Sequence, residues 1–205
     1  MFDRQFFDAP SVETAPLLLG AVLRHSTAEG TVAVRLTEVE AYLGEADPGS
    51  HAYRGPSKRN AVMYGEPGHL YTYFTYGMHV CANLTCSPAG TASAVLLRGA
   101  EVIDGIEFAR VRRRTSKTDA DLARGPARLV VALGITLADG GADLAAPPFE
   151  LTLPPRPLPF ESGPRTGVSG AGGSRDYPWR FWLPGERSVS PYRAHAPKRR
   201  PADPA

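Results

Sequence analysis

Glycine and proline interrupt this chain so often that only short helices and strands fit between them. The 21 glycines and 20 prolines among 205 residues are well above the average usage of a globular domain. Eight of them fall within residues 43–68, which we therefore interpret as loop. A loop of this length is uncommon as a simple connection, so either it has a function or this assignment is wrong.

The segments between these interruptions are mostly rich in β-branched and aromatic residues, which favours strands over helices. The expected strands cover residues 21–26, 31–42, 70–76, 78–85, 94–100, 149–153, 166–169 and 180–183. Helices are expected at residues 11–20, 102–114 and 126–133, which carry residues typical of helix starts and ends.

These elements predict an α+β fold. We expect a single domain over residues 1–193, mainly an antiparallel curved sheet with a protruding β-hairpin and several peripheral helices. The hairpin would turn at Gly77, between two strand-like segments. Residues 194–205 are rich in proline, alanine and basic side chains, and we expect them to form a disordered tail.

Charge is unevenly distributed along the chain, although its total is close to neutral. The formal net charge of +2 excludes a dedicated polycation such as a histone-like protein. Residues 1–50 carry a net charge of −5, residues 51–100 carry +3, residues 101–150 carry −1 and residues 151–205 carry +5. This asymmetry favours an acidic site beside a basic surface.

The N-terminal residues and the two cysteines indicate where in the cell the protein is expected. The N-terminus lacks the order of a signal peptide, and no window approaches the roughly 18 apolar residues of a membrane helix. We expect no membrane association and a cytoplasmic location, at the nucleoid if the protein is bacterial. Cys81 and Cys86 cannot build a disulfide scaffold, which favours a reducing compartment. A metal site with nearby His79 would need three or four convergent ligands, so we expect neither metal nor cofactor.

Two carboxylates and a tyrosine alternate along the strand expected at residues 31–42. Glu38, Glu40 and Tyr42 would share one face of that strand. Two carboxylates on one face are costly unless one is protonated or solvated. The pattern alone favours a solvated sheet face, and the alternative is a general base in a partly buried site. Alternation does not choose between the two glutamates.

Aromatic and basic side chains crowd residues 51–83, where five of the eight tyrosines lie. Tyr76 precedes Gly77 at the expected hairpin turn, and an exposed ring there favours a binding role. Tyrosine planes beside Lys58 and Arg59 suit base stacking with phosphate contact. The alternative is that these tyrosines are ordinary half-buried strand residues.

Taken together, these features predict an enzyme that reacts on a nucleobase. Such enzymes take the base out of the stack, hold it between aromatic rings and fill the gap left behind. A carboxylate then activates water against the anomeric carbon, as in glycoside hydrolysis. Two other classes stay open. A nucleic-acid-binding module has no use for a carboxylate near phosphates, and a hydrolase of free nucleosides has little use for an exposed ring and basic loops.

Several short motifs follow one another along nearly the whole chain. They are TEVEAYLG, then His51, RN, PGHLYTYFTYGMHVCANL, VLLRGAE, RGPARL, and GV followed by PWRFW. In this order, from about residue 11 to about residue 190, they resemble the alkyladenine (3-methyladenine) DNA glycosylase family. The combination is far more specific than any one motif.

The resemblance implies a monofunctional DNA glycosylase that acts on damaged purines, alkylated or deaminated, and so initiates base excision repair. Water is then the nucleophile, and no lysine Schiff base forms. By position, Glu40 matches the general base, which leaves Glu38 a structural or supporting role. Arg98 matches an arginine near the water, and Val168 falls where a main-chain carbonyl helps to hold it.

The resemblance also assigns the side chains around the flipped base. Tyr42, His51 and Tyr73 match the three that enclose it, and Asn83 matches the residue that disfavours the exocyclic amino group of guanine. Alkylated purines carry positive charge, so aromatic faces attract them. His79 stands where a relative has tyrosine, and we assign it no catalytic role.

The partner implied by the resemblance is double-stranded DNA. Tyr76 matches the ring inserted where the nucleotide was, and Met78 matches a residue that touches the opposite strand. Charge alone suggests that Lys58 and Arg59 contact phosphates. We expect a monomer, and we interpret the basic cluster at residues 110–117 as a solvated helix face.

Overall fold

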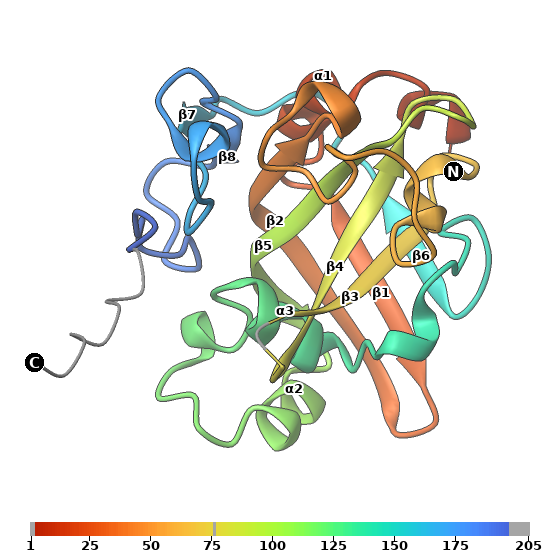
Figure 1. Ribbon diagram of the computed structural model, residues 1–205. Helices are drawn as coiled ribbons and strands as arrows, with labels where there is room; N and C mark the ends of the chain where they lie inside the picture. Colours follow the sequence, from red (N-terminus) through yellow and green to blue (C-terminus); the bar gives the residue numbers. More distant parts are fainter. Residues whose placement is uncertain (1–2, 76, 197–205) are drawn as a thin grey trace, which may run out of the picture.

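The computed structural model describes residues 3–75 and 77–196 (Figure 1). The strands are β1 (Val22–Thr27), β2 (Gly30–Tyr42), β3 (Leu70–Thr75), β4 (His79–Cys86), β5 (Ser93–Asp104), β6 (Phe149–Thr152), β7 (Glu161–Gly163) and β8 (Arg180–Trp182). The α-helices are α1 (Ser11–Leu17), α2 (Ile106–Arg112) and α3 (Pro126–Leu133). Short 3-10 turns cover Arg4–Phe7, Gly44–Ala46, Ala61–Tyr64, Asp119–Asp121, Leu137–Asp139 and Ala171–Gly173.

The predicted α+β class is confirmed. The strands form an antiparallel sheet in the order β3-β4-β5-β2-β1-β6, and β3 and β6 do not pair to close it within the described residues. β7 and β8 extend the sheet beside β2. Within residues 3–75 and 77–196, none of the helices combines the length and apolar character needed to cross a membrane. The expected tail lies largely outside the described residues, as does Tyr76.

β2 is the central strand of the sheet. It pairs with β5 along one edge, and along the other edge first with β1 and then with β8. β8 lies opposite Glu38, Val39 and Glu40. Both carboxylates therefore lie where β2 has neighbours on each side, which removes them from the sheet edge.

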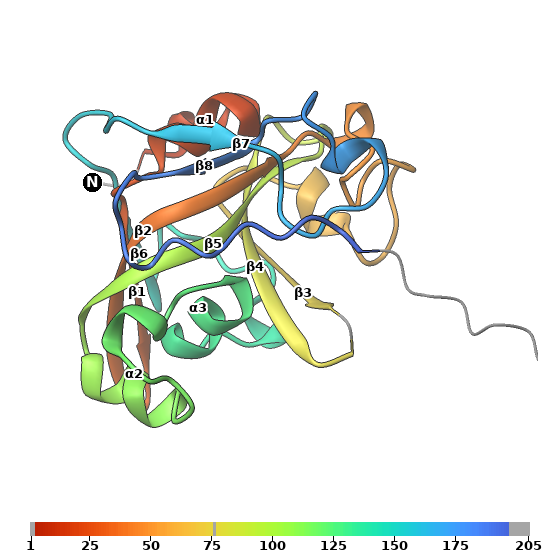
Figure 2. The ribbon, with the colours of Figure 1, turned by 90° about the vertical axis from the view of Figure 1, so that its left-hand side faces the viewer.

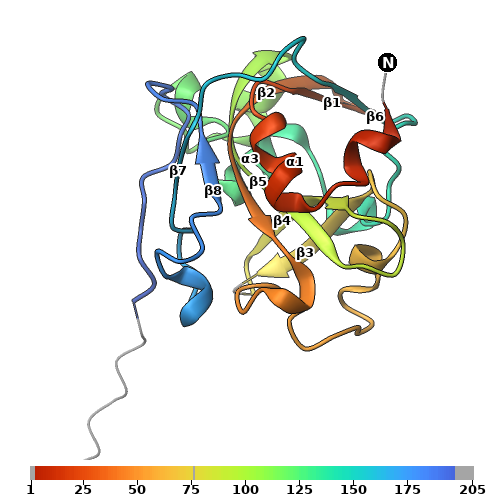
Figure 3. The ribbon, with the colours of Figure 1, turned by 90° about the horizontal axis from the view of Figure 1, so that it is seen from above.

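Alternation along the strands separates an apolar face from a polar one. Val39 of β2, Ala82 and Leu84 of β4 and Leu97 of β5 belong to the main apolar core. α1 and α3 contribute to the same core, and the sheet curves around them (Figure 3). Side chains at the intervening positions point to the other face, as the alternation of residues 38, 40 and 42 predicts.

An irregularity in the pairing of β2 with β5 redirects one of these side chains. Glu38 lies opposite Gly99 and Val39 lies opposite Leu97, so Arg98 is an extra residue on β5. Such bulges turn a side chain away from regular alternation and are common next to active sites. A Cβ on Gly99 would lie 3.1 Å from the Cβ of Glu38, so glycine permits the close approach.

The long loop at residues 43–68 is packed rather than loose. It covers a second apolar cluster of buried side chains, namely Ala52, Met63, Tyr71, Ala92 and Ala94. Beside it, β3 and β4 form a hairpin that extends away from the helices (Figure 2). Gly77 has a φ of +65° in the turn, which glycine adopts without strain.

Three local predictions need correction. Residues 102–104 continue β5 instead of opening a helix, because Gly105 at φ +67° separates the strand from α2. Residues 166–169 form no strand, since Gly167 at φ +73° turns the chain. The strand β7 was not expected at all.

Candidate active site

A cavity of about 370 Å³ opens on the polar face of the sheet. Its walls come from the end of β2, the loop after it, the β3–β4 hairpin, β5, the start of α3 and residues 166–169. The lining residues are Tyr42, Pro48, Gly49, His51, Met63, Tyr71, Tyr73, Thr75, His79, Cys81, Asn83, Leu96, Arg98, Pro126, Ala127, Thr166, Gly167, Val168 and Ser169. Six residues that the sequence assigned to chemistry or to a bound base therefore line one cavity.

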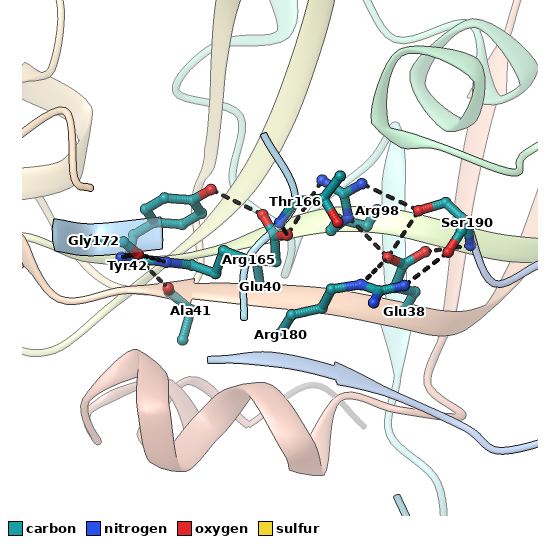
Figure 4. Close-up of polar contacts among 10 residues, drawn as sticks. All are labelled: Glu38, Glu40, Ala41, Tyr42, Arg98, Arg165, Thr166, Gly172, Arg180 and Ser190. Atoms are coloured by element: carbon teal, nitrogen blue, oxygen red, sulfur yellow. Dashed lines mark hydrogen bonds and ion pairs between the residues drawn. The ribbon is translucent and has the colours of Figure 1, made fainter. Parts of the chain in front are cut away.

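Glu40 does not itself line this cavity, but it lies next to Tyr42, Arg98 and Thr166, which do (Figure 4). Its side chain is 0% exposed, and the three groups that contact it all belong to cavity-lining residues. The Thr166 amide donates to Oε1 at 2.7 Å, and the Tyr42 hydroxyl donates to Oε2 at 2.9 Å. Arg98 Nη1 is 3.4 Å from Oε1. The expectation of a solvated carboxylate face is therefore wrong, because β8 and the chain around Thr166 cover this part of β2.

The Tyr42 hydroxyl stays protonated and donates to Glu40. Burial is the main cause that raises the pKa of Tyr42 well above 10, and the Glu40 charge raises it further. The hydroxyl therefore remains a hydrogen-bond donor at neutral pH. The ring itself is half-buried and lines the cavity.

Arg98 bridges the two carboxylates. Its Nε donates to Glu38 at 2.9 Å, and its Nη1 faces Glu40. Burial alone would lower the pKa of Arg98, but Glu40 and Glu38 raise it above its ordinary value. A permanent positive charge is therefore held at the cavity wall.

Glu38 is closed off by a network of donors. Its Oε1 accepts from Arg98, from Arg180 Nε at 2.6 Å and from the Ser190 hydroxyl at 2.9 Å. Its Oε2 accepts from the Ser190 amide at 2.6 Å. Burial would raise the pKa of Glu38, but Arg98, Arg180 and the Ser190 amide hold it below the ordinary 4.5. Glu38 is thus a buried anion with a structural role.

Aromatic rings form another part of the cavity wall. His51 meets Tyr73 edge to face at 4.5 Å between ring centroids, and its Nδ1 lies 3.1 Å from the Tyr71 hydroxyl. Burial of the ring and, second, the charge of Arg59 lower the pKa of His51 from 6.5 to about 4. His51 is therefore neutral at neutral pH, although the residue as a whole is exposed to solvent.

Asn83 and Val168 complete the cavity. Asn83 is buried, and its Nδ2 donates to the Tyr71 carbonyl at 3.2 Å, which orients the amide. Val168 lines the cavity on the segment that follows Thr166. Cys81 also lines it, and burial raises the pKa of its thiol.

Of the residues expected to contact DNA, the three that the structure describes do not line the cavity. Met78 is 70% exposed in the hairpin turn. Lys58 and Arg59 are exposed on the long loop, and the Arg59 guanidinium lies 5.8 Å from the Tyr73 ring centroid. The prediction for Tyr76 falls outside the described residues.

The basic cluster at residues 110–117 belongs to another surface. Arg110 pairs with Glu107 and Asp119, and all three side chains are largely exposed. This pairing is consistent with the interpretation as a solvated helix face. Among the described residues, no three histidine, cysteine or acidic side chains are grouped to hold a metal ion.

Sequence reasoning missed several polar residues in the cavity wall or behind it. Arg180, Ser190, Thr166, Arg165 and Asp47 all take part in buried polar contacts around the two glutamates or Tyr42. None of them stands in a pattern that alternation or charge could single out. The only usable signal was the PWRFW motif, which contains Arg180 but indicates no partner for it.

The arrangement suits hydrolysis of a bond beside a flat aromatic group. The aromatic wall can stack on such a group, while a buried carboxylate and a permanent cation lie together at the floor. General base catalysis by a carboxylate needs this kind of contact with the reacting water. An exposed basic loop at the rim suits a polyanionic substrate.

Comparison with known proteins gives a consistent result. The profile of the methylpurine-DNA glycosylase family matches residues 5–187. A protein of Leifsonia xyli subsp. xyli, which bears the provisional name of a 3-methyladenine DNA glycosylase, is 67% identical over 94% of this chain and 92% of its own length. A protein of Streptomyces avermitilis with the same provisional name is 55% identical over 96% of this chain and 94% of its own.

Proposed function

From the premise that this chain belongs to the methylpurine-DNA glycosylase family, and is a DNA glycosylase, we propose how it acts. It flips alkylated or deaminated purines out of double-stranded DNA and hydrolyses their N-glycosidic bond with an activated water. An abasic site is left. The observation that carries this proposal is the buried carboxylate of Glu40 at the floor of an aromatic cavity.

The damaged base occupies the cavity between Tyr42, His51 and Tyr73. A volume of about 370 Å³ is within the usual range for a small-molecule site, so it can hold a purine. A cationic alkylpurine gains from the electron-rich ring faces. Because the pKa of His51 is about 4, its imidazole is neutral and does not repel that cation.

Asn83 contributes selectivity. Its amide is oriented by the hydrogen bond to the Tyr71 carbonyl. With Nδ2 fixed in this way, a guanine would bring its own amino donor into a buried site shaped for hypoxanthine or adenine derivatives. Unpaired buried donors are costly, so guanine-derived bases are excised poorly.

Chemistry proceeds by attack of water on the anomeric carbon of the flipped nucleotide. The C1′–O bond forms as the C1′–N bond to the base breaks, and Glu40 accepts a proton from the water. The electron pair of the broken bond leaves with the base, which neutralises a cationic alkylpurine. A neutral base such as hypoxanthine must also acquire a proton. Arg98 stays charged beside Glu40. The Val168 carbonyl can accept a hydrogen bond from the second hydrogen of the water.

Access to Glu40 depends on the segment at Thr166. In the free protein the carboxylate is 0% exposed and both its oxygens are already hydrogen-bonded. Water can reach it only if the contact with the Thr166 amide or the Tyr42 hydroxyl loosens. Catalytic contacts in free enzymes are often rearranged in this way on substrate binding.

The DNA duplex lies across the rim of the cavity. Lys58 and Arg59 contact phosphates, Met78 touches the opposite strand and Tyr76 fills the gap that the flipped nucleotide leaves. One asymmetric cavity needs one chain, so the protein acts as a monomer. Its substrate would place it in the cytoplasm, at the nucleoid if the cell is bacterial.

An excision panel tests this function. The purified protein is incubated with duplexes that each carry one alkylated or deaminated purine, with the same oligonucleotides as single strands, and with the free nucleosides. We expect release of the damaged base from duplexes and little or none from nucleosides. Turnover of nucleosides at the same rate as duplexes would instead identify a small-molecule N-glycoside hydrolase.

A further inference from the structure

A fully buried arginine lies behind the cavity and outside the mechanism described above. Each of its N–H groups has an acceptor, and Figure 4 draws the contacts with Ala41 and Gly172. Arg165 Nη1 and Nη2 donate to the two oxygens of Asp47 at 2.5 and 2.6 Å. Nη1 also donates to the Ala41 carbonyl at 2.9 Å, and Nη2 and Nε donate to the Gly172 carbonyl. The side chains of Arg165 and Asp47 are both 0% exposed.

The flat guanidinium also contacts the ring of Tyr42. The guanidinium carbon is 4.5 Å from the Tyr42 ring centroid, and Trp179 and Tyr177 flank it at 5.2 and 5.8 Å. Burial would lower the pKa of Arg165, but Asp47 and Tyr42 raise it. The cation is therefore permanent, and it is held by a planar fork that lysine cannot reproduce.

These contacts tie together three walls of the cavity. Ala41 belongs to β2 beside Tyr42, Asp47 lies on the loop that leads to His51, and Gly172 follows the segment of Thr166 and Val168. The junction is close-packed. A Cβ on Gly49 would lie 2.5 Å from Arg165 Nη2, and one on Gly172 would lie 2.4 Å from the Gly49 amide nitrogen.

Only one of these walls links Arg165 to the reacting groups through a side chain. The Tyr42 ring contacts the guanidinium, its hydroxyl donates to Glu40 at 2.9 Å, and its remaining surface lines the cavity. The orientation of the Tyr42 ring therefore determines two things. One is the shape of the cavity wall that would contact the base, and the other is the hydrogen bond from the Tyr42 hydroxyl to Glu40. A small misplacement of such a group can cost a large factor in rate.

We propose that Arg165 is a positioning residue for base excision, which acts by holding the Tyr42 ring in the orientation that serves both the base and Glu40. This inference rests on the function proposed above. The alternative is that Arg165 and Asp47 only stabilise the fold. The two differ in one respect, since a positioning residue loses its effect on catalysis when Tyr42 is no longer there to be positioned.

A double-mutant cycle distinguishes them. Arg165→Lys keeps the charge but loses the fork, and Tyr42→Leu removes the ring and hydroxyl while keeping bulk. Single-turnover excision of an alkylated purine from a duplex is measured for the wild type, both variants and the double variant, with thermal unfolding of each. Arg112→Lys is the matched control, because Arg112 is also mostly buried and donates to the Ala132 carbonyl, but none of its hydrogen-bond partners lines the cavity.

We expect Arg165→Lys to slow excision on the order of 10- to 100-fold in the wild-type background. In the Tyr42→Leu background the same change should alter the rate by no more than about twofold, the scatter expected when a coupling is lost. Arg112→Lys should leave the rate unchanged. If Arg165→Lys does not fold, Asp47→Asn takes its place in the cycle, because it weakens the paired hydrogen bonds that hold the guanidinium against the Tyr42 ring.

Equal rate losses in the two backgrounds would overturn the inference and leave a purely structural arginine. An unchanged rate for a folded Arg165→Lys would overturn it too. Neither result touches the proposed function, which fails if the wild type releases no damaged base from any duplex or turns over free nucleosides at the same rate as duplexes.

Discussion

Two glutamates share one strand, one face and full burial, but differ in the groups that contact them. Glu38 and Glu40 are two residues apart on β2, point to the same face and are both 0% exposed. Glu38 accepts from two arginines and from both the amide and the hydroxyl of Ser190. Glu40 accepts from one amide and one hydroxyl, with Arg98 at 3.4 Å.

The difference comes from what each carboxylate faces. Charged donors reach Glu38 from both neighbouring strands, Arg98 from β5 and Arg180 from β8, and the amide and hydroxyl of Ser190 complete its hydrogen bonds. Glu40 faces groups that themselves line the cavity, so it is one contact away from a substrate. Buried charge of the first kind holds a fold together, whereas the second kind can take part in a reaction. Each of the following changes tests that division.

Glu40→Gln should have the largest effect, and on activity rather than stability. The amide keeps the shape and an acceptor for the Thr166 amide but cannot take up a proton from water. We expect base release under single-turnover conditions to fall about 100- to 10,000-fold, with duplex binding retained. Excision at the wild-type rate would show that Glu40 is not the base and would remove the main distinction between the two glutamates.

Glu38→Gln should act in the opposite way, mainly on stability. It leaves Arg98 and Arg180 buried without their shared anion, and breaking a buried ion pair on one side costs about 3–5 kcal/mol. Urea unfolding measures this loss. Glu101→Gln on β5 is the control, since its pair with Arg35 is exposed and worth about 0–1 kcal/mol. Equal stability of the two variants would contradict the structural role of Glu38.

The pH dependence of stability should also follow Glu38. Its pKa is lowered in the folded protein from the 4.5 of an ordinary glutamate, so the unfolded chain binds the proton more readily. The contribution of Glu38 is therefore complete above about pH 4.5 and is lost as the pH falls through its lowered pKa. Between about pH 7 and about pH 3 the unfolding free energy of the wild type should fall more than that of Glu38→Gln. Parallel curves would mean that another carboxylate causes the acid sensitivity.

Asn83→Ala should give the smallest effect, which should be confined to the choice of base in the cavity next to Glu40. Removing the oriented amide relieves the clash with the amino group of guanine. The ratio of guanine-derived to hypoxanthine excision should rise on the order of 10-fold, the value of about one buried hydrogen bond. Competition between two duplexes in one reaction measures the ratio directly. A change in stability as large as that of Glu38→Gln would instead make Asn83 part of the fold's support.

Much of the fold could be predicted from local pattern. α3 begins and ends where Pro126 and Gly134 predict, and the hairpin turns at Gly77. These features follow from preferences of single residues and short spacings, which survive in most tertiary contexts. The strand β5 could not be bounded in this way, because its last residues are held by pairing with β2.

The candidate site, too, was predicted in part from local pattern and in part not. Alternation places Glu38, Glu40 and Tyr42 on one face, and the family motifs distinguish Glu40 from Glu38. No local pattern indicates that both carboxylates are buried, because the cover comes from β8, Ser190 and Thr166, more than 120 residues further along the chain. The solvated sheet face that alternation alone predicted for these carboxylates was therefore wrong.

The sequence by itself determined the strand and helix preferences, the family and six of the residues that line the cavity. It could do so because propensity, alternation and motif order are properties of neighbouring residues. Only the tertiary structure decided which carboxylate is neutralised by arginines, which stays next to the cavity and which arginine lies behind Tyr42. Those outcomes depend on long-range packing, since the energy of a buried charge is set by the donors that reach it and not by its neighbours in the chain.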